Sequence, residues 1–161
     1  FEIIKRISNE LNTKPEEISE KINNLNQTIK KLKKELSNTD NNEEIIDNLI
    51  SKSIKINKYD VITENLDNYD PKKLRDTCEI LNKKYQGIII LSSIYENKIN
   101  LVISVPKIFL TNFNANEMVK SVSKIINGGG GGNPQIAQGG GTEINSQEEI
   151  IKILIKQIKN G

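Results

Sequence analysis

Apolar residues recur along residues 18–36 at alternating spacings of four and three positions. They are Ile18, Ile22, Leu25, Ile29, Leu32 and Leu36. This spacing is the heptad pattern of a coiled-coil seam, and the polar residues on the other sides favour a narrow seam over a wide buried face. We therefore predict a helix that takes part in a coiled coil or a helical hairpin. An amphipathic helix packed on its own domain is the alternative.

Further helix signals flank this seam. Residues 1–12 have apolar positions at helical spacing, and Thr13 is a favourable N-cap for the helix that follows. The polar stretch SNTDNN at residues 37–42 is typical of a turn. A second helix is predicted from about residue 43 to residue 54. We therefore expect residues 1–57 to form a helical arm or hairpin.

From residue 58 onward the pattern changes to short strands and helices. Asp70 followed by Pro71 is a helix start, and Ser146 with Glu149 three residues later is a capping pair. The predicted strands cover residues 59–66, 88–94 and 98–105, and the predicted helices cover 71–85, 114–126 and 146–159, with a glycine-rich loop or strand before the last helix. This order predicts an α/β (α+β) fold over residues 58–161, in which helices pack on a small mixed sheet beside a Gly-rich loop.

Composition excludes several kinds of chemistry. The net charge of +2 is far from the strongly basic balance that indicates nucleic-acid binding by itself. The single cysteine, Cys78, excludes an internal disulfide and indicates a reduced, cytoplasmic setting. Without histidine the chain lacks the common zinc ligand sets and any Ser-His or Cys-His pair, so we expect no catalytic residue, metal or cofactor here. No apolar run approaches membrane-spanning length, and we expect no membrane partner.

Glycines fill residues 128–132 and 139–141. No lysine follows them as in a P-loop, and a predicted helix precedes them where the dinucleotide fingerprint has a strand. A flexible linker is one interpretation. Because Pro134 restricts the backbone, we instead expect an ordered segment in which residues 130–132 and 140–141 lie close together, as a backbone crossing beside the sheet. We expect glycine to be needed there first of all for positive φ.

The pattern G-G-G-x-P-x-x-A-Q-x-G-G after a helix resembles the signature near the end of bacterial alanyl-tRNA synthetases. The matching residues are Gly130, Gly131, Gly132, Pro134, Ala137, Gln138, Gly140 and Gly141. That family usually carries Arg and Asp beside the proline, where this chain has Asn133 and Gln135. If the arginine supports a phosphate contact, that contact is weakened here. The helical arm and the order of strands and helices resemble the same family, so the resemblance covers essentially the whole chain.

The resemblance implies a C-terminal domain without an active site, in a parent alanine–tRNA ligase of the cytoplasm. Such a domain holds the tRNA elbow, where the D and T loops meet, and can pair subunits into a homodimer. Residues 1–12 would be the tail of the preceding editing region, and ATP, Mg and Zn would bind elsewhere in the parent. The chain opens at Phe1 inside a helical pattern, as expected of a piece of a longer protein. The RNA-binding residues implied are Gly130, Gly131, Gly132, Asn133, Pro134, Gln135, Gln138, Gly140 and Gly141.

Two other functions stay open. The modest charge and an aromatic content of 4% suit a purely structural dimerisation domain. The same α/β module also ends the DHH-family phosphoesterases, where it is called the DHH-associated domain. In those enzymes a histidine follows the glycines, so the lack of histidine in this sequence argues against a phosphoesterase module.

Overall fold

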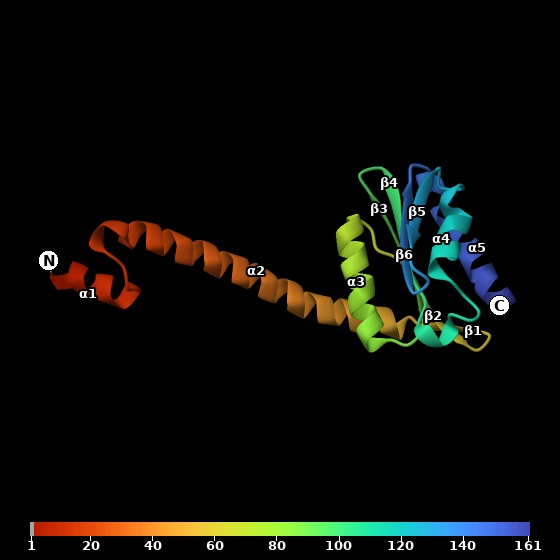
Figure 1. Cartoon of the computed structure of the whole chain (residues 1–161), viewed down its shortest axis with the longest axis horizontal. Coiled ribbons are helices and arrows are strands. Elements are labelled where there is room, and N and C mark those ends of the chain that lie inside the picture. Colours follow the sequence, from red (N-terminus) through yellow and green to blue (C-terminus); the bar gives the residue numbers. More distant parts are fainter. Residues whose placement is uncertain (1) are drawn as a thin grey trace. The chain divides into compact units, whose positions relative to one another are not determined.

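The computed structural model describes residues 2–161, except for the side chains of residues 33–41 (Figure 1). The chain divides into two compact units, Phe1–Glu44 and Ile45–Gly161. The second unit therefore begins earlier in the chain than the predicted domain of residues 58–161. Among the described residues, no helix combines the length and the apolar character needed to cross a membrane.

The first unit consists of helices. α1 spans Glu2–Leu11, a 3-10 turn spans Pro15–Glu17, and α2 runs from Ile18 to Ser51, so that its last turns belong to the second unit. The predicted N-cap at Thr13 is wrong. Its hydroxyl donates a 3.2 Å hydrogen bond to the Glu17 carboxylate, and Lys14 holds the cap position without a side-chain hydrogen bond.

α2 is one continuous helix of 34 residues. The predicted turn at residues 37–42 and the separate helix at residues 43–54 are therefore wrong. Of the two predicted alternatives, a helical arm and a helical hairpin, the structure has the arm. The stretch SNTDNN contains weak helix formers but neither glycine nor proline. Each such residue costs at most about 0.7 kcal/mol relative to alanine, and packing of the helix end offsets that cost.

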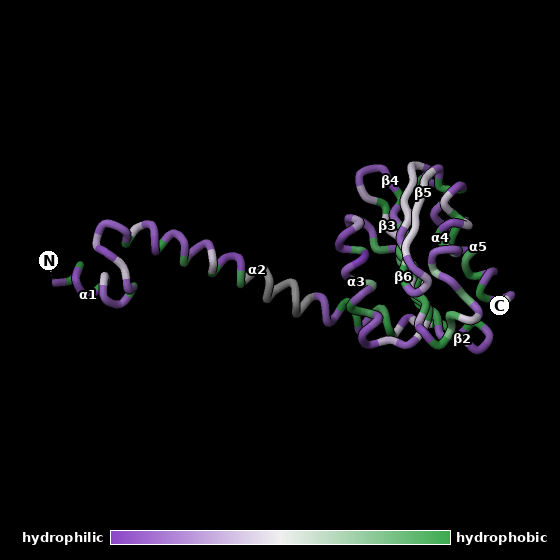
Figure 2. Tube along the Cα trace, in the orientation of Figure 1, coloured by the Kyte–Doolittle hydropathy of each residue, from purple (hydrophilic) through white to green (hydrophobic). Residues whose placement is uncertain are grey.

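The predicted seam of α2 lies largely in solvent. Its exposed fractions are 42% for Ile22, 42% for Leu25, 47% for Ile29 and 56% for Leu32, and Ile18 is half-buried. Leu36 falls within residues 33–41, whose side chains lie outside the described part of the chain. The early part of α2 is mainly hydrophilic with isolated hydrophobic positions (Figure 2). The alternative of an amphipathic helix buried on its own domain therefore does not describe these residues.

The second unit is built around a six-stranded sheet in the order β1-β2-β3-β4-β6-β5. The strands are β1 Ile54–Ile56, β2 Tyr59–Asn65, β3 Ile88–Tyr95, β4 Lys98–Ser104, β5 Gly128–Gly132 and β6 Ile136–Gly141. β2 and β3 pair in parallel, and the other neighbouring strands pair antiparallel. The predicted mixed sheet is confirmed. β1 lies where a helix end was predicted, and the glycine-rich stretch forms two strands rather than a loop.

Helices pack on both faces of this sheet: α3 (Pro71–Lys84), α4 (Ala115–Ser123) and α5 (Gln147–Asn160). On one face Ile88 and Ile90 of β3 share a core with residues of α4 and α5. On the other face Ile89 and Leu91 share a core with residues of α3 and the end of α2. Because β3 is buried on both faces, its apolar run is nearly continuous rather than alternating.

The end of α2 belongs to this second core. Ile46 and Leu49 are 1% and 2% exposed and pack with residues of α3 and β3. Burial of these two side chains explains why the compact unit begins at Ile45 rather than at the predicted residue 58.

Local capping decides where two of the helices begin. The Asp70 carboxylate accepts a 2.8 Å hydrogen bond from the Lys73 backbone N–H, and Pro71 opens α3, as predicted. Asn114 likewise caps α4. Ser146 holds the N-cap position of α5, as predicted, but a 3-10 turn over Ile144–Ser146 leads into the helix and the Ser146 side chain makes no capping hydrogen bond.

Candidate functional site

The glycine-rich stretch forms a β-hairpin at one edge of the sheet. β5 pairs with β6, with Gly129 opposite Gly140, Gly130 opposite Gly139 and Gly131 opposite Gln138. β6 in turn pairs with β4, which joins the hairpin to the sheet. The two glycine tracts are close together, as predicted, but as neighbouring strands within the sheet. The predicted backbone crossing beside the sheet is therefore wrong.

Hydrogen bonds within the turn of this hairpin, and from the turn to neighbouring elements, fix its position. The Asn133 side-chain carbonyl accepts hydrogen bonds from the backbone N–H groups of Gln135 and Ile136, each 2.9 Å long. The Pro134 carbonyl accepts from the N–H of Ala115 at 2.9 Å, and the Gln135 carbonyl accepts from the N–H of Val105 at 2.8 Å. These bonds tie the turn to the start of α4 and the end of β4, so the predicted ordered segment is confirmed and a flexible linker is not.

Close approach of α4 explains the glycines on one face of the hairpin. A Cβ at Gly130 would lie 2.5 Å from Cγ1 of Val119, and a Cβ at Gly139 would lie 2.9 Å from the same atom. The expectation of positive φ is wrong, because no glycine among the described residues has one. Asn127, which leads into β5, takes the left-handed conformation instead, with φ of 49°.

The opposite face of the hairpin is open. A Cβ at Gly129 would meet no atom within 4 Å, and a Cβ at Gly131 would meet one, Oδ1 of Asn116, at 3.6 Å. We call the space over this face the glycine hollow; it is a surface hollow of about 370 Å³ between α3, β4 and the hairpin. Its walls and floor include Pro71 and Leu74 of α3, residues 100–102 of β4, and residues 129–131 and 138–140.

Two carboxamide side chains border the glycine hollow. Asn100 is 9% exposed, and its Nδ2 donates two long hydrogen bonds of 3.5 Å, to Oγ of Ser93 and to the Lys98 carbonyl. Bonds of that length are weak, so this amide can exchange them for a ligand. Gln138 accepts a 3.3 Å hydrogen bond at Oε1 from Nη1 of Arg75. Both groups offer a donor and an acceptor to a bound molecule.

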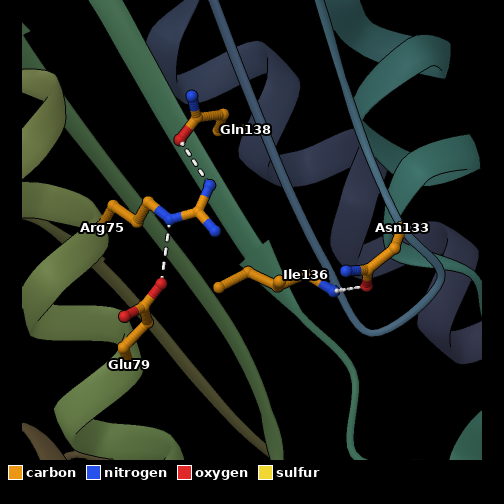
Figure 3. A network of polar contacts seen from close by, with 5 residues as sticks. All are labelled: Arg75, Glu79, Asn133, Ile136 and Gln138. Carbon is orange, nitrogen blue, oxygen red and sulfur yellow. Dashed lines mark hydrogen bonds and ion pairs between the residues drawn. The ribbon is translucent and has the colours of Figure 1, made fainter.

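Sequence reasoning missed Arg75. Its Nε also pairs with Oε1 of Glu79 at 2.9 Å, one helical turn along α3 (Figure 3). Arg75 and Gln138 are 63 positions apart, so nothing in the sequence pattern brings them together. The one available signal was the residue type, since Arg75 is one of two arginines in a chain rich in lysine.

The predicted site residues thus divide into three groups. Gly131, Gln138 and Gly140 line the glycine hollow, as does Gly130 through its backbone. Asn133, Pro134 and Gln135 form the hairpin turn. Cβ positions at Gly132 and Gly141 would clash with backbone atoms of Ile136 and Ile126, so those two glycines serve packing.

Cys78 is not a reactive group. It is fully buried on α3, and burial, together with the neighbouring charge of Glu79, raises the pKa of its thiol to about 12. Because only the thiolate is strongly nucleophilic, this cysteine is an inert core residue at neutral pH, as predicted.

Known proteins resemble both the sequence and the fold. The family model of the DHHA1 domain matches residues 58–160. The chain is 35% identical over 151 residues to an alanine–tRNA ligase of Lawsonia intracellularis, a match that covers 89% of the chain. The chain spans 17% of the length of that relative.

Solved structures agree. The C-Ala domain from Aquifex aeolicus alanyl-tRNA synthetase matches with a TM-score of 0.62 and 28% identity, over 67% of this chain and 98% of that domain. RecJ of Thermus thermophilus, in complex with Mn²⁺, matches with a TM-score of 0.58 over 92% of this chain and 20% of RecJ, but at 10% identity this likeness concerns the fold alone. The chain belongs to the DHHA1 domain family, and it matches the C-terminal domain of alanyl-tRNA synthetases rather than their catalytic part.

Proposed function

We propose that this chain is the tRNA-binding C-terminal part of a cytoplasmic alanine–tRNA ligase. In this role it holds the tRNA elbow, so that the aminoacylation and editing parts of the parent enzyme act on one tethered tRNA. The similarity to alanine–tRNA ligases and to a C-Ala domain supports the parent activity. The phosphoesterase alternative has less support, because the likeness to RecJ is limited to the fold and the sequence contains no histidine.

The open face of the glycine hairpin is the observation that carries the RNA-binding role. Glycine at 130 and 139 is required by the close approach of Val119, but glycine at 129 is not required by any neighbouring atom. A bare backbone at that position leaves the floor of the glycine hollow open. An open floor leaves room for the splayed, unpaired bases by which proteins recognise folded RNA.

The polar groups around this floor suit the same ligand. The carboxamides of Asn100 and Gln138 can bond to base edges, which present both donors and acceptors. The net charge of +2 provides no broad basic surface. We therefore expect modest affinity that rests on a few phosphate contacts and falls as salt displaces them.

Filter binding with bulk tRNA and with a linear RNA of equal length tests the proposal. The chain should prefer tRNA, and its affinity should fall between about 50 and about 200 mM salt. Gly129→Ala and then Gly129→Val should weaken tRNA binding progressively without lowering the unfolding midpoint, because both side chains project into open space. Equal, salt-insensitive binding of both RNAs would refute the proposal, as would full tRNA binding by Gly129→Val.

A specific observation favours subunit pairing as a second role. Ile22, Leu25, Ile29 and Leu32 keep coiled-coil spacing and are each more than two-fifths exposed, and such a seam is stabilised when a second helix covers it. Sedimentation should show a dimer that Leu25→Glu converts to a monomer, since a buried unpaired charge is costly. A monomeric wild-type chain would exclude pairing through this seam.

A further inference from the structure

Arg75 lies between two hollows on the same side of the sheet. Its Nη1 bonds to Gln138, which borders the glycine hollow, and its Nε pairs with Glu79. Glu79 borders a second hollow of about 400 Å³, which extends past Asn82 of α3 and Tyr85, the residue after α3, toward Ile136 of β6. The guanidinium thus reaches from α3 to Gln138 of β6 while it pairs with Glu79 (Figure 3).

Stability alone does not account for this arrangement. The side chains of Arg75 and Glu79 are 43% and 49% exposed, and exposed ion pairs within one helix contribute little to folding. A guanidinium carries five N–H donors in a planar fork. Among the described residues, its hydrogen bonds to protein groups involve Nε and Nη1. Donors on Nη2 are therefore left for a ligand.

The chemistry of these groups selects an anion with several oxygens. A planar guanidinium binds phosphate through two parallel hydrogen bonds, which a lysine ammonium does not reproduce. Glu79 presents a carboxylate to the same guanidinium and so occupies the place that a phosphate would take. Gln138 is uncharged and can keep its hydrogen bond when the anion changes.

Resting on the proposed RNA-binding role, we propose that Arg75 is the phosphate-binding residue of this face, with Glu79 as its partner in the free protein. When RNA binds, a backbone phosphate replaces the Glu79 carboxylate on the guanidinium, while Gln138 continues to orient it. The nucleosides on the two sides of that phosphate lie over the two hollows.

Salt-dependent tRNA binding by single variants of the full chain tests this assignment. Arg75→Gln should weaken binding about tenfold, as expected when a hydrogen bond to a charged group is lost, and should reduce the slope of log affinity against log salt by about one. Arg75→Lys should keep the salt slope, because the positive charge remains. It should lower the affinity, because an ammonium group lacks the planar fork of donors that binds phosphate through two hydrogen bonds. Glu79→Gln should tighten binding, because the competing carboxylate is removed.

Lys156→Gln on α5 is the matched control. It removes the same charge from an exposed position on a helix that packs against the other face of the sheet, and it should leave binding unchanged. Thermal unfolding of each variant checks the fold, and the exposure of Arg75 and Glu79 predicts similar midpoints.

Four results would overturn the assignment. Equal effects of Arg75→Gln and Lys156→Gln would mean that only net charge matters. Equal weakening by Arg75→Gln and Glu79→Gln would mean that the ion pair serves the fold. Absence of tRNA binding by the wild-type chain would refute the proposed function together with this inference, whereas wild-type binding that Arg75→Gln leaves intact would refute the inference alone.

Discussion

Exchanging neighbouring glycines of β5 for alanine separates the two reasons for glycine in the hairpin. At Gly130 a Cβ would lie 2.5 Å from Cγ1 of Val119, 2.6 Å from the Gln138 carbonyl oxygen and 2.6 Å from Cα of Gly139. Two of these three atoms belong to the backbone of β6, so the clash cannot be relieved by a side-chain rotation. Gly130→Ala should therefore cost about 1–3 kcal/mol of unfolding free energy, as is typical of overpacking.

Gly129→Ala should change the unfolding free energy in the opposite direction. The added methyl group meets no atom within 4 Å, and the backbone does not have a positive φ. Alanine then reduces the conformational freedom of the unfolded chain, which should stabilise the protein by about 0.4–1 kcal/mol. The two variants add the same methyl group to adjacent residues of one strand, so each is the control for the other.

Urea unfolding of the whole chain, followed by circular dichroism, measures both changes, and equal m-values would show that the denatured states are comparable. Adding Val119→Ala to Gly130→Ala should recover part of the loss, since it removes one of the three clashing atoms; a double-mutant cycle would report this as coupling. A Gly130→Ala variant as stable as wild type, or a Gly129→Ala variant destabilised to the same extent, would refute the argument from close packing.

Three further predictions concern the fold. Leu49→Ala should cost about 2–5 kcal/mol in urea unfolding, because Leu49 is 2% exposed in the second core; a negligible loss would place the start of the folded unit after α2. Asp70→Ala should lower the unfolding free energy by about 0.5–2 kcal/mol through loss of the N-cap, and an unchanged thermal midpoint would contradict that role. Cys78 should resist a disulfide reagent until urea is added, and fast labelling of the native chain would refute its burial. Its pKa is raised from 9.0 to about 12 in the native state, so the unfolded thiol ionises first as pH rises above 9.0. Cys78 should therefore make the protein less stable as the pH rises from 9.0 toward the native pKa.

Local signals in the sequence determined most of the helices and strands of the second unit. The Asp70-Pro71 pair was sufficient to locate the start of α3, because a capping side chain bonds to backbone N–H groups only two or three residues away. The apolar run of β3 identified a buried strand for a similarly local reason. The heptad spacing and the glycine motif, read with the family resemblance, led to the C-terminal domain of alanyl-tRNA synthetases.

Tertiary packing decided the features of the fold that local sequence signals do not specify. Residues 37–42 lack a strong breaker, and α2 continues through them to reach Ile46 and Leu49, whose burial is a long-range event. Glycine has low intrinsic strand preference, so β5 and β6 form because β4 pairs with one side of the hairpin and Val119 packs close to it. Arg75 reaches Gln138 only because α3 lies along the sheet near β6. The sequence alone therefore determined most elements of the second unit and the family, whereas the continuity of α2, the open glycine face and its arginine depend on contacts between residues far apart in the chain.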